Sequence, residues 1–101
     1  MKLIITPSAE AQIAHQFAEG IARHGIKTAE KTFARVERFF AQTLAAYPRA
    51  GTFIAEPKLY EWYITRTPFI IVYRVETDAD IVRVLGFFHH AQDRSEFDPD
   101  A

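Results

Sequence analysis

Apolar residues recur at two different periods along the chain, and the change of period separates a helical part from a sheet part. Ile13, Phe17 and Ile21 recur every four residues, which is typical of an amphipathic helix. We predict this helix over about residues 9–24, with Ser8 in a position suited to capping its start. Its apolar stripe requires a partner layer.

A second stripe of apolar residues predicts a second helix, and Thr28 is in a position to cap it. The stripe steps by three or four residues until Pro48, which cannot continue a helix. Its members are Phe33, Val36, Phe40, Leu44 and Tyr47. Only about residues 25–27 connect the two helices, and so short a connection produces an antiparallel helix hairpin.

Four short runs of branched and aromatic residues predict β-strands. The first, residues 3–6, precedes the helices and is stopped by Pro7. After residues 48–57, which we expect to form an irregular loop, the others are predicted over residues 58–64, 69–76 and 81–89. Short loops join the last three, so they should be antiparallel neighbours. The predicted fold of residues 1–101 is a single two-layer α+β domain of order strand-helix-helix-strand-strand-strand, with a largely antiparallel sheet and the helix hairpin on one face.

The predicted register assigns the meander residues to two faces. If the loops close simple hairpins, Arg74 lies opposite Arg83, Val72 opposite Leu85 and Ile70 opposite Phe87. The larger apolar set is assigned to the helices: Tyr60, Trp62, Phe69, Ile71, Tyr73, Val75, Val82, Val84 and Phe88. The other face has an apolar centre of Tyr63, Ile70, Val72, Leu85 and Phe87, and a rim of Glu61, Arg74, Arg83 and His89.

An apolar centre with a polar rim is typical of a protein interface, which indicates a binding partner. The alternative is that Leu59, the loop of residues 48–57 or the C-terminal tail folds over this face, with Phe97 as the tail's apolar residue. We expect Glu61 to relieve the repulsion between Arg74 and Arg83. Arg94 has Asp93, Glu96 and Asp98 nearby as bonding partners.

Composition narrows the classes of function. The chain has no cysteine and a formal net charge of −1, so thiol chemistry is excluded and no global field attracts nucleic acid. No segment approaches the roughly 20 apolar residues that span a bilayer, and we expect a cytoplasmic protein with no membrane partner. His89 and His90 should alternate sides of a strand, so we expect no metal and no cofactor, and we interpret them as capping the strand end. Arg66 and Arg94 are expected near the same end of the sheet as His89, and the three form a candidate basic cluster.

Two segments carry a resemblance to a known family. They are Thr-Pro-Phe-Ile-Ile-Val-Tyr-Arg-Val at 67–75, and the strand of residues 81–89 continuing into His90-Ala91-Gln92-Asp93-Arg94. With the order of elements, they resemble the RelE/ParE superfamily of toxins from type II toxin-antitoxin modules. The ending His-x-Ala-x-Asp-Arg resembles the ParE-like branch, often described as plasmid stabilisation proteins. The resemblance covers almost the whole chain.

The resemblance implies a toxin that inhibits DNA gyrase by binding and is neutralised by a cognate, ParD-like or similar antitoxin. The alternative is a ribosome-dependent mRNA endoribonuclease of RelE type. That branch commonly has an arginine early in the strand ending Val-Tyr, where this chain has Phe69, Ile70 and Ile71, and no tyrosine follows Tyr73. His89 and arginines could still supply an imidazole and cations, so the alternative stays open.

We therefore assign no catalytic residue and favour a binding inhibitor over an enzyme. The candidates for contacting the target are Arg66, His89 and Arg94. The candidates for contacting the antitoxin are Tyr63, Ile70, Val72, Arg74, Arg83, Leu85 and Phe87.

Overall fold

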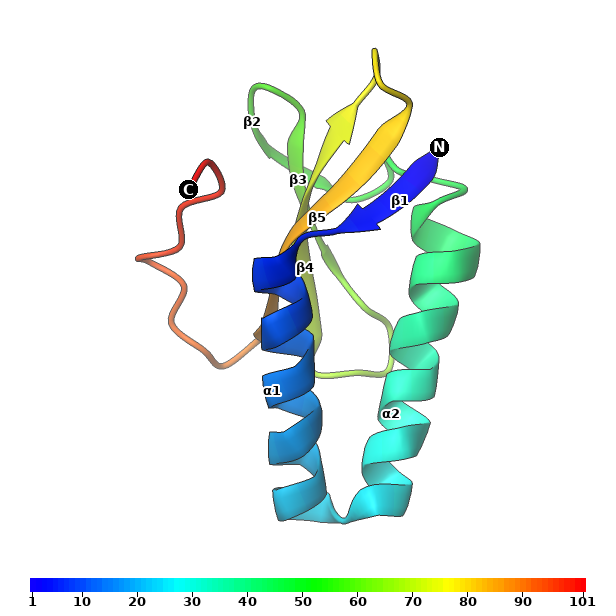
Figure 1. The fold of residues 1–101 in the computed structure, drawn as a ribbon, viewed down its shortest axis with the longest axis vertical. Coiled ribbons are helices and arrows are strands. Elements are labelled where there is room, and N and C mark those ends of the chain that lie inside the picture. Colours follow the sequence, from blue (N-terminus) through cyan, green and yellow to red (C-terminus); the bar gives the residue numbers. More distant parts are fainter.

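Five strands and a helix hairpin form two layers in the computed structural model, which describes residues 1–101 (Figure 1). The elements are β1 (Lys2–Ile5), α1 (Pro7–His24), α2 (Ile26–Arg38), a π-helical continuation η1 (Phe39–Leu44), β2 (Thr52–Ala55), β3 (Leu59–Tyr63), β4 (Phe69–Glu76) and β5 (Ile81–His89). The sheet order is β1-β5-β4-β3-β2. All neighbouring pairs are antiparallel except β1 and β5, which are parallel. The predicted α+β class and element order are confirmed.

The sequence did not predict strand β2. β2 lies within the stretch expected to be an irregular loop, and it pairs antiparallel with β3 at the edge of the sheet. All four of its residues are exposed, so the segment has no inward-facing alternation that would mark it as a strand.

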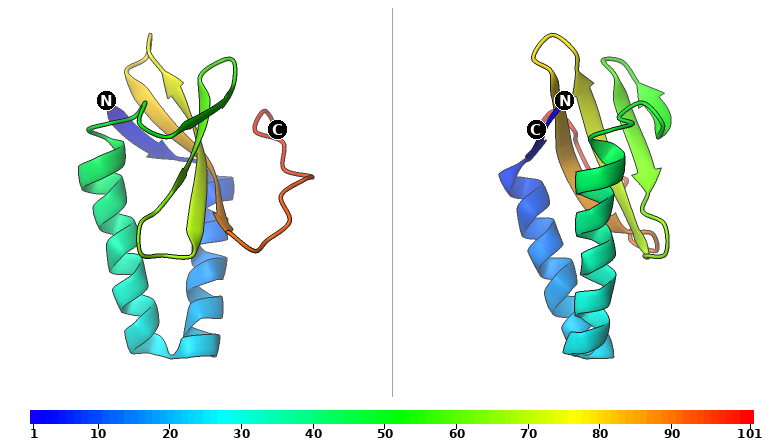
Figure 2. Two further views of the ribbon diagram at one scale, coloured as in Figure 1. Left: turned by 180° about the vertical axis from the view of Figure 1, so that it is seen from behind. Right: turned by 90° about the vertical axis from the view of Figure 1, so that its right-hand side faces the viewer.

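The connection between the two helices is shorter than predicted, and the first helix is capped by a different residue. Thr6, not Ser8, caps α1, because its Oγ1 accepts a hydrogen bond from the Ala9 amide at 3.2 Å. Gly25 alone connects the helices: its φ of +86° suits glycine, and α2 begins at the next residue, before Thr28. Both helices reach past the end of the sheet (Figure 2).

The main core lies between the helices and the sheet, with aromatic rings at its centre. The Phe33 ring of α2 has its centroid 5.2 Å from Phe17 of α1 and 5.2 Å from Phe69 of β4. The predicted helix-facing residues lie in or against this core with one exception, Phe88. No helix is both long and apolar enough to cross a membrane.

A β-bulge explains that exception. Tyr73 pairs with Val84 but Val72 pairs with Gly86, so Leu85 is an extra residue in β5. The predicted pairs of Val72 with Leu85 and Ile70 with Phe87 are therefore wrong, whereas Arg74 opposite Arg83 is confirmed. After the bulge, the residues of β5 point to the face opposite to the one predicted. Phe87 lies in the main core and Phe88 on the other face of the sheet.

Candidate functional site

The face of the sheet away from the helices, here called the outer face, has a small core of its own. Four buried residues form it, Leu59, Ile70, Val72 and Phe88, and Leu85 and Phe97 pack against them. Strand alternation points the first three to this face, and the bulge adds Phe88. The outer face is therefore a second apolar layer.

The C-terminal segment, residues 90–101, covers part of the outer face. After β5 it turns back along the sheet (Figure 1), and the Phe97 ring packs edge-on against Phe88 with centroids 5.0 Å apart. Gly86 makes room for this contact, because a Cβ there would lie 2.5 Å from the Phe88 ring and 3.0 Å from the Phe97 ring. Of the two alternatives for this face, cover by the tail is observed.

Two ion pairs hold the C-terminal segment to the sheet. An Nη1 of Arg94 lies 3.5 Å from the Glu61 carboxylate, and its guanidinium lies 5.9 Å from the centroid of the Phe88 ring. Arg74 donates to Asp100 at 2.8 Å and to the Pro57 carbonyl at 2.8 Å. Glu61 therefore pairs with Arg94 across the sheet, and the expectation that it pairs with Arg74 is wrong. So is the expected partnership of Arg94 with acids of its own segment.

The repulsion between Arg74 and Arg83 is relieved by a different carboxylate. Arg83 makes a two-pronged ion pair with Glu76, the second bond measuring 3.1 Å between Nη2 and Oε1. The hydrogen bond from Arg83 holds the pKa of Glu76 below its usual value. Both arginines are therefore already engaged with acids.

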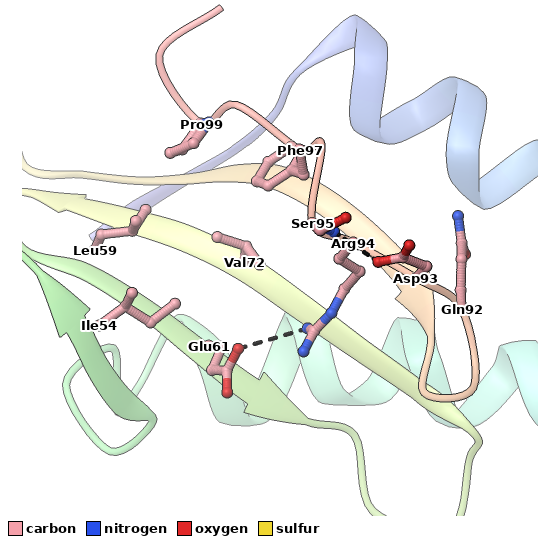
Figure 3. Close-up of a pocket in the computed structure, with 10 residues that line it drawn as sticks. All are labelled: Ile54, Leu59, Glu61, Val72, Gln92, Asp93, Arg94, Ser95, Phe97 and Pro99. Atoms are coloured by element: carbon pink, nitrogen blue, oxygen red, sulfur yellow. Dashed lines mark hydrogen bonds and ion pairs between the residues drawn. The ribbon is translucent and has the colours of Figure 1, made fainter.

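A cavity of about 550 Å³ remains between the C-terminal segment and strands β2 and β3 (Figure 3). Its lining residues are Ile54, Leu59, Glu61, Val72, Gln92, Asp93, Arg94, Ser95, Phe97 and Pro99. The sheet supplies mainly apolar side chains and the segment mainly polar ones. The Asp93 carboxylate accepts a hydrogen bond from the Ser95 amide of the same segment, and hydrogen bonds from Ser95 lower the pKa of Asp93. The cavity suits a ligand with one apolar and one polar side.

The end of β5 carries a histidine pair. The rings of His89 and His90 stack with centroids 4.7 Å apart, so the expectation that they lie on opposite sides of a strand is wrong. His89 Nδ1 accepts a hydrogen bond from the Ala91 amide at 3.1 Å, which confirms that it caps the strand end. Burial, followed by the charges of His90 and Arg23, lowers the pKa of His89, which favours its neutral form. No three His, Cys, Asp or Glu side chains are grouped to hold a metal ion.

The three target-binding candidates do not form one cluster. The His89 ring packs edge-on against Phe69 of the main core, whereas Arg94 lies on the outer face with Glu61. Arg66 is exposed in the loop between β3 and β4, where its φ is +63°. Arg66 is thus the most accessible of the three.

The antitoxin-binding candidates also lie in different parts of the structure and differ in exposure. Phe87 is in the main core and Ile70 and Val72 are buried in the outer-face core, whereas Tyr63 is 57% exposed. Leu85, Arg74 and Arg83 are partly exposed. Phe88 was predicted on the helix side and not on this face, because nothing in the residue pattern marks the bulge at Leu85.

Comparison with solved structures shows which proteins share this fold. The fold is similar to the chromosomal ParDE toxin-antitoxin system from P. aeruginosa, with 18% identity, a TM-score of 0.66 and coverage of 88% of this chain and 95% of that chain. It is also similar to the toxin-antitoxin complex RelBE2 from Mycobacterium tuberculosis, with 18% identity, a TM-score of 0.62 and coverage of 87% and 95%. At this level of identity the two likenesses show a shared fold.

The family follows from the sequence. Residues 3–94 match the model of the ParE toxin of the type II toxin-antitoxin system parDE. The chain belongs to this ParE toxin family, and the predicted superfamily and toxin class are confirmed. The sequence has no significant match among curated proteins.

Proposed function

We propose that this toxin acts by binding DNA gyrase and is neutralised by an antitoxin that docks on the outer face. The observation that carries the proposal is the match of residues 3–94 to the ParE toxin model. The proposed target places the protein in the cytoplasm.

The arrangement of polar side chains supports binding over RNA cleavage. In-line cleavage needs a base, an acid and cations around one phosphate. Here His89 packs toward the main core while Arg94 lies with Glu61 on the outer face, and Arg83 is paired with Glu76. The first five residues of β4, Phe69 to Tyr73, are buried and carry no cation. A binding inhibitor needs no such cluster.

The outer-face cavity supports an antitoxin as partner. Its apolar floor includes Leu59 and Val72, and Arg94 stands at its polar wall. An amphipathic segment complements this surface, because its apolar side can replace solvent over the sheet and its polar side can pair with Arg94 and with the carboxylates of Glu61 and Asp93. Exposed Tyr63 extends the surface along β3.

A purified gyrase assay tests the target. We expect the protein to block supercoiling or to stabilise cleaved DNA complexes, and Arg66→Ala to weaken inhibition about tenfold because it removes an exposed cation near the end of the sheet. Arg38→Ala, which removes an exposed cation from α2, is the matched control and should inhibit like the wild type. Unimpaired gyrase at stoichiometric excess of the protein contradicts the proposal. Message cut in a translating extract, with His89→Ala abolishing cleavage, would replace it by the ribonuclease function.

A further inference from the structure

β5 has a strand neighbour along only half of its outer edge. β1 pairs with residues Ile81 to Val84, and the Thr6 amide donates to the Val84 carbonyl at 3.1 Å. There the chain turns into α1, so the edge of residues 85–89 has no strand beside it. Amides on such an edge need other acceptors.

Two glutamine side chains supply those acceptors. The Phe87 amide donates to Gln12 Oε1 at 2.9 Å, and the His89 amide donates to Gln92 Oε1 at 3.3 Å. Gln16 Nε2 donates to the same Gln92 oxygen at 3.4 Å. The two amides belong to residues two apart, Phe87 and His89, which is the spacing at which a neighbouring strand offers its carbonyls. The glutamine oxygens thus occupy positions that strand carbonyls would take.

A cavity of about 280 Å³ lies along this edge, beside the first turns of α1. Near the start of α1 the cavity is lined by the small side chains of Ser8 and Ala11. Its other lining side chains are mainly glutamine amides, together with the imidazole of His15. Gln92 is on an exposed part of the C-terminal segment. Each amide donates a single neutral hydrogen bond to the oxygen of a flexible glutamine side chain, whereas an added strand offers a donor and an acceptor at every second residue.

The charges around His89 indicate which segment fits. Arg23 at the end of α1 and His90 both act electrostatically on His89, and His15 lines the cavity. Glu19 pairs with Arg23 at 3.3 Å, but on a largely exposed helix surface. An incoming carboxylate near His89 would therefore have the guanidinium of Arg23 as its charged partner.

We propose that the edge of residues 85–89 is a strand-addition site, where an extended, acidic segment of the antitoxin displaces Gln12 and Gln92 and pairs with Phe87 and His89. In naming the antitoxin as the source of the segment, this inference rests on the proposed function. The glutamines close the edge when no partner is bound.

Amide hydrogen exchange of the full ¹⁵N-labelled chain tests the proposal, free and saturated with the antitoxin encoded beside it. The rates of Phe87 and His89 are divided by that of Tyr73, which is within β4 between two paired strands, to remove effects of global stability. We expect these ratios to fall at least tenfold in the complex. In the free protein, Gln12→Ala and Gln92→Ala together should raise them at least threefold, and binding should remove that increase. Gln42→Ala, an exposed glutamine of η1, is the matched control and should change neither ratio.

Each outcome has one meaning. Antitoxin binding with unchanged ratios for Phe87 and His89 overturns the strand-addition site and leaves the proposed function standing. Absence of antitoxin binding overturns both. Protection of the two amides that grows with protein concentration in the free chain, without further change on adding antitoxin, identifies a second copy as the occupant and overturns the assignment to the antitoxin.

Discussion

At the residue scale, Gly51 is required by the close approach of two backbone segments and a tyrosine. A Cβ at this position would overlap the Tyr73 hydroxyl and lie 2.8 Å from the Glu61 carbonyl, whereas a Cβ at Gly20 in α1 would meet Ala29 at an ordinary 3.6 Å. We expect Gly51→Ala to lower the free energy of unfolding by about 1–3 kcal/mol through overpacking. Gly20→Ala, its control, should raise it by about 0.5–1 kcal/mol, since it improves a helix interior. Urea denaturation measures both, and equal effects would contradict this account.

The hydroxyl of Tyr73 makes stability depend on alkaline pH. The side chain is fully buried and stacks on Tyr60, and its oxygen has no hydrogen-bond partner of standard geometry although the Gly51 amide is close. Burial raises the pKa of Tyr73 from 10.0 to about 12, so the unfolded chain loses this proton first. Its contribution is complete below pH 10 and declines toward pH 12, by at most about 1.4 kcal/mol per pH unit.

Replacing this hydroxyl provides the test. Tyr73→Phe should leave stability at pH 7 unchanged or raise it by up to about 1 kcal/mol, because no satisfied hydrogen bond is lost. Between pH 10 and 12 its unfolding free energy should fall less steeply than that of the wild type. Tyr47→Phe, at an exposed position, should retain the wild-type slope. Denaturation curves at these pH values decide the matter, and parallel slopes for Tyr73→Phe and the wild type would refute the assignment.

At the element scale, the parts predictable from sequence are those with a strong period. The residues of β4 and β5 alternate or are continuously apolar, and their predicted bounds coincide with the observed ones. The bulge at Leu85 could not be predicted, because an extra residue changes no local propensity and is fixed by packing of Phe87 against the helices and Phe88 against Phe97. One unforeseen residue thus exchanged two phenylalanines between the faces, and with them the make-up of the candidate site.

The contact of Phe97 with Phe88 holds the C-terminal segment to the sheet more strongly than its two ion pairs do, because both pairs remain partly open to solvent. Phe97→Ala should lower the free energy of unfolding by about 1–2 kcal/mol, since it removes the ring that covers Phe88, and should increase binding of a hydrophobic dye to the outer face. Tyr47→Ala is the control, because that ring is 64% exposed. Thermal unfolding and dye fluorescence report the two effects. A variant with unchanged stability and no added dye binding would mean that the segment does not cover the sheet in solution.

At the scale of the whole molecule, the sheet separates two apolar layers with different roles. The helix side is a continuous core that sets the fold, whereas the outer face has a core of four residues, a cavity and a cover held by Phe97 and two ion pairs. Opening such a cover costs less than opening the main core, because less apolar area is involved. The outer face is therefore where a partner can gain contacts without unfolding the toxin.

Tyr63 offers a test of this division, because it is the accessible aromatic residue of the outer face. Tyr63→Lys should weaken antitoxin binding at least tenfold, about 1.4 kcal/mol, while growth inhibition without antitoxin is unchanged, since its side chain is 57% exposed and contributes little to either core. Tyr47→Lys makes the same chemical change at a 64% exposed position that follows η1, away from the outer face. Titration calorimetry and growth curves with and without the antitoxin give the readouts. If both lysine variants bind the antitoxin as tightly as the wild type, the antitoxin reaches the toxin by another surface.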